Sequence, residues 1–326
     1  MERIAYISAE TTVYWSGIVL TLAAAAAMSF FLAFYLNKSG NAPAAFAALP
    51  ICAALGIVLG RFFHWYSRAD SYDGFLSAIT DYSSGGYALW GVFLGCFLAA
   101  ALLRLLRLHK NLPEMLDCMA LAGLPGIAVG RLASFFNASD RGQVVSFTSL
   151  PVASPVTNSI SGATDYRFAT FLFQAIIALT LFVILAVFYL RGCKKGTLRD
   201  GDACLIMLMC YGSSQVVMDS SRYDSLFFRS NGFVSIVQVL GALGLGLAIV
   251  VFSRRLVKGR GFRFWYVLVW LLMAAAIGGA GFMEYYVQRH GNEALFAYSV
   301  MSACLILVVA LTLWLRGLAG KRQTKP

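Results

Sequence analysis

The sequence predicts an all-α, polytopic integral membrane protein with about nine transmembrane helices. Of its 326 residues, 60% are hydrophobic and only 13% are charged, whereas about a quarter of the residues in soluble domains carry a charge. The mean hydropathy is +0.74. Apolar stretches recur along the chain, and each has roughly the 20 residues that cross a hydrocarbon core about 30 Å thick.

Nine apolar windows give the helix count in chain order. They cover residues 13–36, 44–66, 85–106, 115–136, 168–190, 203–219, 233–253, 264–283 and 296–315. The first window is too long for a removable signal peptide and lacks the short basic start and the cleavage site of one. We therefore expect it to remain as a membrane anchor.

Lysine and arginine residues gather in the connections that follow the odd-numbered helices. They are Lys38, Arg104, Arg107, Lys110, Arg191, Lys194, Lys195, Arg199, Arg254, Arg255, Lys258, Arg260, Arg263, Arg316, Lys321, Arg322 and Lys325. By the positive-inside rule these connections are cytoplasmic, so the N-terminus lies outside and the C-terminus inside. The net charge of +11 is dispersed over short loops. It therefore suits anionic lipid head groups and gives no support to nucleic-acid binding.

The seven cysteines are expected to be free thiols. Six lie within apolar windows and Cys193 lies in a cytoplasmic connection, so none faces the oxidising side of the membrane. The sequence has no Cys-x-x-Cys pair and no His/Cys cluster. We therefore expect neither a metal ion nor another cofactor.

Polar and ionisable residues gather at the outer ends of the predicted helices. They are Arg61 at the end of the second helix, Arg131 at the end of the fourth, and Gln215, Asp219, Arg222 and Asp224 where the sixth leaves the membrane. The third helix begins at the same face with "DYSSGGYALWG". Ionisable groups beside hydrocarbon commonly cost a few kcal/mol, so these residues are candidates for function.

Several of these residues also have a purely structural explanation. An arginine near a helix end often extends its charged group to the interface, and this explanation is strongest for Arg61 and Arg222. Gly85 and Gly86 are typical of a turn or of a close helix contact. His64 lies among aromatic residues in "FFHWY", which is typical of an interfacial aromatic belt.

The segment "GRLASFFNASDRG" resembles the signature of bacterial prolipoprotein diacylglyceryl transferases, Gly-Arg-x-Gly-Asn-Phe-x-Asn-x-Glu-x-x-Gly. Gly130, Arg131, Phe135, Asn137 and Gly142 match it in place. Further landmarks of the family follow its order over about residues 10 to 255. They are "VYWSG", "LGRFFHWY", "SSGGYALWGVFLG", Asp117 and Ala120 at the spacing of Asp-x-x-Ala, and "QVVMDSSRYD".

The sequence departs from the family pattern at several motif positions. Trp90 stands where the family has its histidine, and Gln215 stands where it has an arginine. Ser134 and Ser139 replace an asparagine and a glutamate of the signature, and Ser16 replaces a tyrosine. The chain is therefore predicted to be a divergent member.

The family has seven spanning helices, so two of the nine predicted helices are additional. We expect a transferase-like membrane core at residues 1–255 and an additional pair of helices with a basic tail at residues 256–326. The family landmarks stop before the basic stretch "RRLVKGRGFR". A chain that ends after Lys258 is therefore expected to insert and to bind lipid.

The resemblance implies a transfer reaction at the outer face of a bacterial cytoplasmic membrane. Family members move the diacylglyceryl group of phosphatidylglycerol onto the cysteine thiol of a prolipoprotein signal sequence and release glycerol phosphate. A planar, permanently charged guanidinium binds phosphate with two parallel hydrogen bonds, which explains the arginine of the signature. The expected partners are the membrane, phosphatidylglycerol and the prolipoprotein signal peptide.

The resemblance and the polar cluster together give ten candidate site residues. Arg131 is expected to hold the phosphate and Asn137 to bind glycerol or phosphate oxygens as catalytic residues. The substrate-binding candidates are Arg61, Gly85, Gly86, Gly130, Asp140, Gly142, Gln215 and Arg222. Arg61 or Arg222 is expected to supply the cation that is missing at Gln215. The thiol must also lose a proton, and Asp81, Asp140 and His64 are alternative bases.

Two other functions remain open. Because Trp90 cannot accept a proton, the chain could be a non-catalytic paralogue that binds phospholipid or lipoprotein signal helices. A transporter or channel is disfavoured, because such proteins bind their cargo near mid-depth through broken helices, whereas the polar residues here gather at one rim.

Overall fold

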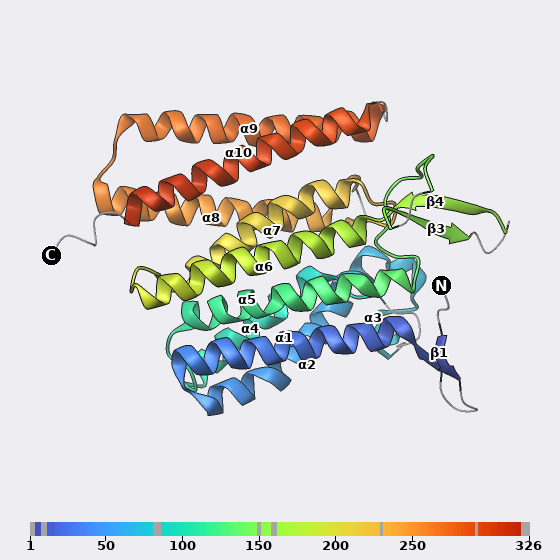
Figure 1. Cartoon of the computed structure of the whole chain (residues 1–326), viewed down its shortest axis with the longest axis horizontal. Helices are drawn as coiled ribbons and strands as arrows, with labels where there is room; N and C mark the ends of the chain where they lie inside the picture. The colour runs from blue at the N-terminus through green and yellow to red at the C-terminus, as the bar shows by residue number, and fades with distance from the viewer. Residues whose placement is uncertain are drawn as a thin grey trace.

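The computed structural model describes residues 4–7, 12–80, 86–148, 151–157, 162–228, 231–290 and 293–320. Within these residues, nine long helices lie with their axes roughly along one common line (Figure 1). They are α1 (Trp15–Ser39), α2 (Ala42–Ser67), α4 (Leu89–Leu105), α5 (Leu112–Arg131), α6 (Thr170–Lys194), α7 (Asp202–Ser220), α8 (Ile236–Arg260), α9 (Phe264–His290) and α10 (Ala294–Gly320). Each helix covers most of one predicted window, so the predicted all-α membrane class is confirmed.

The helix α4 is shorter than the sequence predicted. Eight helices of the described chain are at least 18 residues long and apolar enough to cross a membrane, but α4 has 17 residues and spans about 25 Å. The prediction that this helix begins at residue 85 was wrong, because residues 86–88 are not helical. Gly86 has a φ of +86°, a left-handed conformation that a right-handed helix cannot include.

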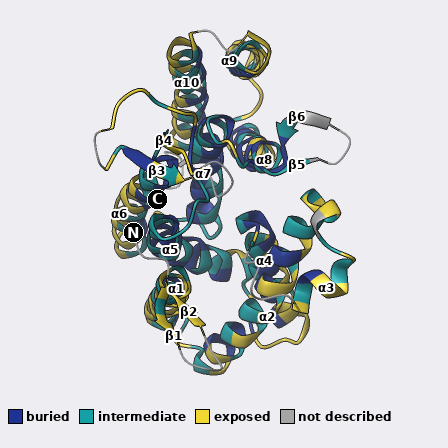
Figure 2. Ribbon diagram, turned by 90° about the vertical axis from the view of Figure 1, so that its right-hand side faces the viewer, coloured by how far each residue is buried: buried dark blue, intermediate teal, exposed yellow. Residues whose placement is uncertain are grey.

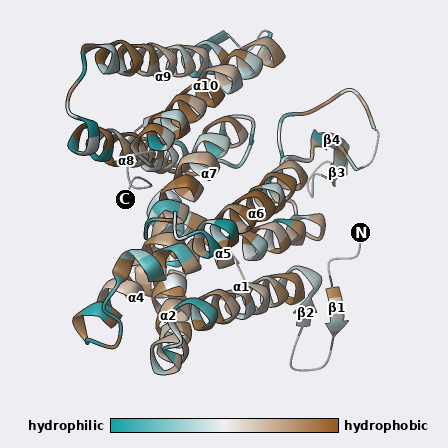
Figure 3. Cartoon of the chain, turned by 60° about the vertical axis from the view of Figure 1, so that its left-hand side comes forward, coloured by the Kyte–Doolittle hydropathy of each residue, from teal (hydrophilic) through white to brown (hydrophobic). Residues whose placement is uncertain are grey.

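Short elements that the sequence did not predict lie in the connections. They are the 3-10 helices η1 (Ala69–Ser71) and η2 (Leu132–Phe135), the helix α3 (Phe75–Thr80), and the antiparallel hairpins β1 (Ile4–Ile7) with β2 (Thr12–Tyr14), β3 (Ala153–Thr157) with β4 (Thr164–Phe168), and β5 (Phe227–Phe228) with β6 (Asn231–Ser235). Figure 1 places β1, β3 and β4 at the end of the bundle opposite the C-terminus. Hydrophobic residues cover the long helices, whereas the connection between α8 and α9 is hydrophilic (Figure 3).

Glycines allow two pairs of helices to approach closely. A Cβ on Gly91 of α4 would lie 2.3 Å from the carbonyl oxygen of Leu59 in α2. A Cβ on Gly212 of α7 would lie 2.6 Å from the carbonyl oxygen of Gly241 in α8. Small residues let helix backbones come together in a membrane, where packing drives association. The positions of α4 on α2 and of α7 on α8 therefore depend on these glycines.

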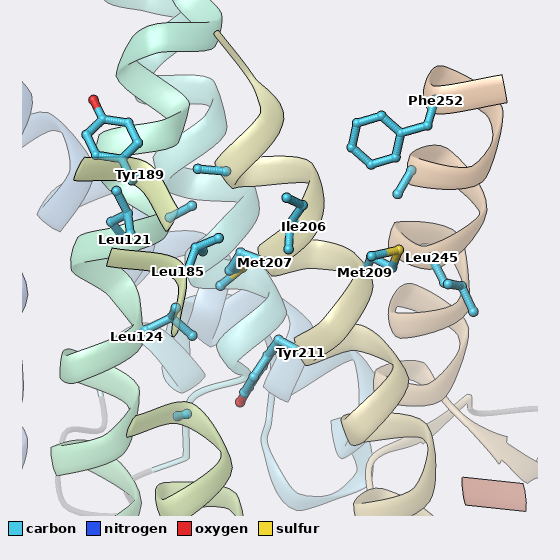
Figure 4. Packing of buried hydrophobic residues seen from close by; sticks show 14 of the residues in the cluster. Leu121, Leu124, Leu185, Tyr189, Ile206, Met207, Met209, Tyr211, Leu245 and Phe252 are labelled. Atoms are coloured by element: carbon cyan, nitrogen blue, oxygen red, sulfur yellow. The ribbon is translucent and has the colours of Figure 1, made fainter. Parts of the chain in front are cut away.

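The helices α5 and α7 lie at the centre of the bundle. More than half of each candidate span is buried, 56% for α5 and 61% for α7, and Figure 2 shows the exposed faces on the surrounding helices. Figure 4 shows Leu121 of α5, Leu185 of α6 and Met207 of α7 close together, and Leu245 of α8 beside Met209 on the other side of α7. All seven cysteines are free, as predicted, although Cys193 lies in the last turn of α6 and not after it.

Asp117 of α5 holds the first turn of α7. Its carboxylate oxygens accept hydrogen bonds from the backbone N–H groups of Gly201 and Cys204, each at 2.8 Å. The first N–H groups of a helix have no partner within the helix, so Asp117 acts as a cap supplied by a neighbouring helix. Asp117 thus has a structural role, which is to fix α7 against α5.

The last helix, α10, contacts α7 at both of its ends. At its start, Asp202 forms ion pairs with Arg255 of α8 and with Arg316 of α10, whose Nη2 lies 2.6 Å from Asp202 Oδ2. At its end, the Tyr298 hydroxyl of α10 donates a hydrogen bond to the Ser220 carbonyl at 3.3 Å. Contacts with α7 and α8 thus make α10 part of the packed bundle.

Replacing Arg316 with alanine is expected to lower the free energy of unfolding by about 1.5–3 kcal/mol. The Asp202 side chain is 4% exposed, and a hydrogen bond to such a charged group contributes about this much. Thermal unfolding of the purified protein in lipid nanodiscs measures the effect. Arg263→Ala is the matched control, because Arg263 is exposed in the connection before α9. Equal changes in both variants would contradict a docking role for Arg316.

The N-terminus is expected on the outer side of the membrane and the C-terminus on the cytoplasmic side. Helix α1 begins and helix α10 ends at opposite ends of the bundle (Figure 1), which agrees with an odd number of membrane crossings. A reporter that is active only in the cytoplasm should therefore be active when fused to the C-terminus. Activity of a C-terminal reporter that works only outside the cell would contradict this orientation and the count of nine.

Candidate functional site

One carboxylate joins two arginines where α5 and α7 end. Arg131, the last residue of α5, places Nη1 2.7 Å from Asp140 Oδ1. Arg222, which follows α7, places Nη2 2.8 Å from the same oxygen. The three side chains are 13%, 10% and 17% exposed for Arg131, Arg222 and Asp140. The cluster is therefore largely shielded from solvent but reachable from the surface.

Backbone contacts hold the two helix ends together. Gly142 pairs with Arg222 as an antiparallel bridge, and the Tyr223 N–H donates to the Arg141 carbonyl at 3.1 Å. Asp140 has a φ of +57°, a left-handed conformation that aspartate tolerates better than most residues. A Cβ on Gly142 would lie 2.8 Å from Thr170 Oγ1. Gly142 is thus required for the close approach that brings Asp140 to both arginines.

The positive charge of the two arginines is neutralised within the protein. Arg222 also pairs with Asp219 at 3.3 Å and with Asp224 at 3.0 Å, so two guanidinium groups meet three carboxylates. Burial alone would raise the pKa of the Asp140 carboxyl, but Arg131 and Arg222 hold that pKa well below its usual range. Asp140 is therefore ionised at neutral pH. A second anion can bind Arg131 only by replacing or sharing Asp140.

Asn137 is connected to this cluster through two serine hydroxyls. Its Oδ1 accepts hydrogen bonds from the N–H and the Oγ–H of Ser139, at 3.0 Å and 2.6 Å. Ser139 Oγ lies 3.3 Å from Ser134 Oγ, which donates to Asp140 Oδ2 at 3.1 Å. Each hydroxyl donates its single hydrogen away from the other, so the two serines place Asn137 beside the carboxylate between the arginines without a continuous chain of hydrogen bonds.

Two buried glutamines lie behind Arg131. Arg131 Nη2 donates to Gln215 Oε1 at 3.4 Å, and Gln174 Nε2 of α6 donates to the same oxygen at 3.1 Å. Gln174 and Gln215 are 0% and 1% exposed. Tyr211, one turn before Gln215, lies next to the Arg131 guanidinium. Together with the ion pairs, these contacts from α6 and α7 surround the guanidinium group of Arg131.

Arg61 and Gly86 form a separate cluster beside α2 and α4. Arg61 donates to the carbonyls of Ala78 at 2.5 Å and Gly86 at 2.8 Å. A Cβ on Gly86 would lie 2.3 Å from the His64 ring, so this glycine packs against the imidazole. Arg222 is therefore the second arginine that pairs with Asp140, the carboxylate that Arg131 binds. Arg61 instead holds the connection between α2 and α4. Gly85 and Asp81 lie outside the described residues.

Gly130, the remaining candidate of the signature, lies in the last turn of α5 and faces α1. A Cβ at this position would lie 3.5 Å from Ala23 Cβ of α1, which is an ordinary van der Waals distance. Gly130 therefore contributes to the packing of α5 on α1, next to the residue that carries the guanidinium of the site.

Comparison with known proteins places this chain in a family. Residues 3–254 match the family model described as prolipoprotein diacylglyceryl transferase. The chain belongs to this family. It is similar to proteins named phosphatidylglycerol–prolipoprotein diacylglyceryl transferase from Streptococcus pyogenes serotypes M5 (strain Manfredo), M49 (strain NZ131) and M1. Each is 29% identical over 225 residues, which cover 67% of this chain and 82% of the relative. The chain is thus a multi-pass protein of a bacterial cytoplasmic membrane.

The site departs from the transferase pattern at the position of the family's histidine. Trp90 is buried and meets Phe93 edge to face at 5.2 Å between ring centroids. Phe93 in turn meets Tyr211 at 6.0 Å, and Tyr211 lies next to Arg131. An aromatic row therefore replaces an ionisable side chain on this side of the arginine.

Sequence reasoning missed two residues around the candidate site, Gln174 and Arg141. Gln174 is a polar residue inside the apolar window 168–190, and that contrast was a usable signal. Arg141 is buried and donates to the carbonyls of Pro155 at 2.7 Å and Asn137 at 2.9 Å. Its role is to hold the loop that carries Asn137, and nothing in its sequence position indicated that.

Proposed function

We propose that this chain transfers the diacylglyceryl group of phosphatidylglycerol to the cysteine thiol of a prolipoprotein signal peptide. Membership of the prolipoprotein diacylglyceryl transferase family supports this function. The observation that carries it in this chain is the pair of arginines, Arg131 and Arg222, that share Asp140 at the end of α5 and α7. Two guanidinium groups held at one point are suited to a phosphate.

The reaction forms one bond and breaks one bond. The thiol sulfur attacks the diacylglycerol carbon that carries the phosphate oxygen, and the carbon–oxygen bond breaks. Glycerol phosphate leaves with that electron pair, and the thiol proton goes to the leaving phosphate or to solvent. A phosphodiester has one negative charge, whereas the released monoester approaches two at neutral pH. Cations at the phosphate therefore stabilise the transition state more than the bound substrate.

Asp140 acts in this proposal as the anion that the substrate replaces. The lipid phosphate takes over the contacts of Asp140 Oδ1 with Arg131 and Arg222, at 2.7 Å and 2.8 Å in the structure. Asp140 keeps the guanidinium groups together until then. A carboxylate whose pKa is held low by two arginines is a weak base, so Asp140 can take the thiol proton only after the phosphate has displaced it.

Restoration of lipoprotein maturation in cells tests the function. A bacterium depleted of its own transferase should recover lipid-modified lipoproteins when it expresses this chain. The Streptococcus pyogenes relative serves as the positive control. Membrane insertion of the chain without recovery, beside recovery with the relative, would favour a non-catalytic paralogue that binds lipid or signal helices.

A further inference from the structure

The amide groups of Gln174 and Gln215 form a buried pair directly behind Arg131. Both side chains are almost fully buried, and they belong to two different helices, α6 and α7. Gln174 Nε2 donates to Gln215 Oε1 at 3.1 Å. The second atom of each amide, Gln174 Oε1 and Gln215 Nε2, has no hydrogen-bond partner among the described residues.

Arg131 fixes which way both amides point. A guanidinium can only donate hydrogen bonds, so the atom of Gln215 that faces Arg131 Nη2 must be the carbonyl oxygen. That oxygen also faces Gln174, so the atom that Gln174 presents to it must be the NH₂ group. The unpartnered atoms are therefore one acceptor, on Gln174, and one donor, on Gln215.

One acceptor and one donor, on two amides that are hydrogen-bonded to each other, complement an alcohol hydroxyl, which donates one hydrogen bond and accepts another. An ammonium group can only donate, so it would leave the Gln215 amide unpaired. A trimethylammonium group can do neither. Leaving a buried polar group unpaired is costly, so the amide pair discriminates against both kinds of head group.

We propose that Gln174 and Gln215 bind a free hydroxyl of the lipid head group when its phosphate is held by Arg131. This inference rests on the proposed function, in which the lipid is phosphatidylglycerol, whose head group carries two free hydroxyls. The amide pair contacts Arg131 directly, so a hydroxyl a few bonds from the bound phosphate is within range once the lipid displaces the side chains that cover the two buried atoms. In this proposal Gln215, at the position where the family pattern has an arginine, recognises the head group by a hydrogen bond to its hydroxyl.

The test compares two lipids of equal charge. Phosphatidylglycerol carries the head-group hydroxyls, and phosphatidylpropanol lacks them. Wild-type protein is expected to bind and use phosphatidylglycerol about tenfold better, since two neutral hydrogen bonds are at stake. Gln174→Met keeps the length of the side chain but removes the acceptor and the hold on Gln215. Binding and use of phosphatidylglycerol should therefore fall in this variant. Binding and use of phosphatidylpropanol should equal those of wild type, so the preference is lost.

Gln288→Leu is the matched control, because Gln288 is an exposed glutamine on α9, and it should keep the preference. Retained activity on phosphatidylpropanol shows that Gln174→Met is folded. A wild type without preference, or a Gln174→Met variant that keeps it, would overturn the inference and assign the amide pair to an ordered water. If no transfer occurs from either lipid, the proposed function fails, and the binding preference measured by native mass spectrometry still decides the hydroxyl site.

Discussion

Replacing Arg131 with alanine is expected to weaken phosphatidylglycerol binding roughly tenfold to a hundredfold. Charge-assisted hydrogen bonds contribute about 1.5–3 kcal/mol each, and 1.4 kcal/mol corresponds to tenfold. The rate of transfer should fall further, by at least about a hundredfold, because the same group meets the charge that develops on the leaving phosphate. Arg131→Lys keeps the charge but loses the planar fork, so it should lie between wild type and alanine. Lipid binding and peptide modification by purified protein measure both effects.

The lysine variant and a control variant separate phosphate binding by Arg131 from a purely structural role. An arginine that only extends to the interface would be replaced by lysine with little change. Arg289→Ala is the matched control, because Arg289 is exposed near the end of α9, and it should leave binding and transfer unchanged. Unchanged lipid binding in both Arg131 variants would remove Arg131 from the site and, with it, the proposed phosphate contact.

Replacing Asp140 with asparagine is expected to lower the free energy of unfolding by up to about 3–5 kcal/mol. The substitution leaves Arg131 and Arg222 beside a neutral amide, and removal of one partner from a buried ion pair has an effect of this size. Added glycerol phosphate should then raise the melting temperature of Asp140→Asn more than that of wild type, because it binds Arg131, which has lost its carboxylate. Thermal unfolding with and without glycerol phosphate measures the difference.

Asp70→Asn provides the comparison, since Asp70 is an exposed aspartate in the connection after α2. It should behave as wild type in both conditions. Equal stabilisation of Asp140→Asn and wild type by glycerol phosphate would contradict the idea that a phosphate takes the place of Asp140.

The membrane class and the order of the helices could be predicted because a span requires a long apolar run, which is visible in one dimension. The start of α4 could not, because it depends on the left-handed backbone of Gly86. The hairpin of β3 and β4 also escaped prediction. Its five-residue strands lie in a connection, where no long run of apolar residues marks them.

The site could be predicted only as a level in the membrane and not as a set of contacts. Arg131 and Arg222 end helices that are predicted to run outward, so the helix count places the two residues at one level. The side chain of Arg61 lies at the same level but points to the carbonyls of Ala78 and Gly86. The packing of α4 on α2 through Gly91 sets that direction, and a sequence pattern does not reveal it.

Trp90 makes the activity of this family member the point to be measured first. The direct measurement is mass spectrometry of a lipobox peptide after incubation with purified protein in phosphatidylglycerol nanodiscs. A diacylglyceryl increment on the peptide cysteine, formed together with an equal amount of glycerol phosphate and absent with Arg131→Ala, is the predicted result. An unmodified cysteine with folded wild-type protein that binds phosphatidylglycerol would contradict transfer at the arginine pair.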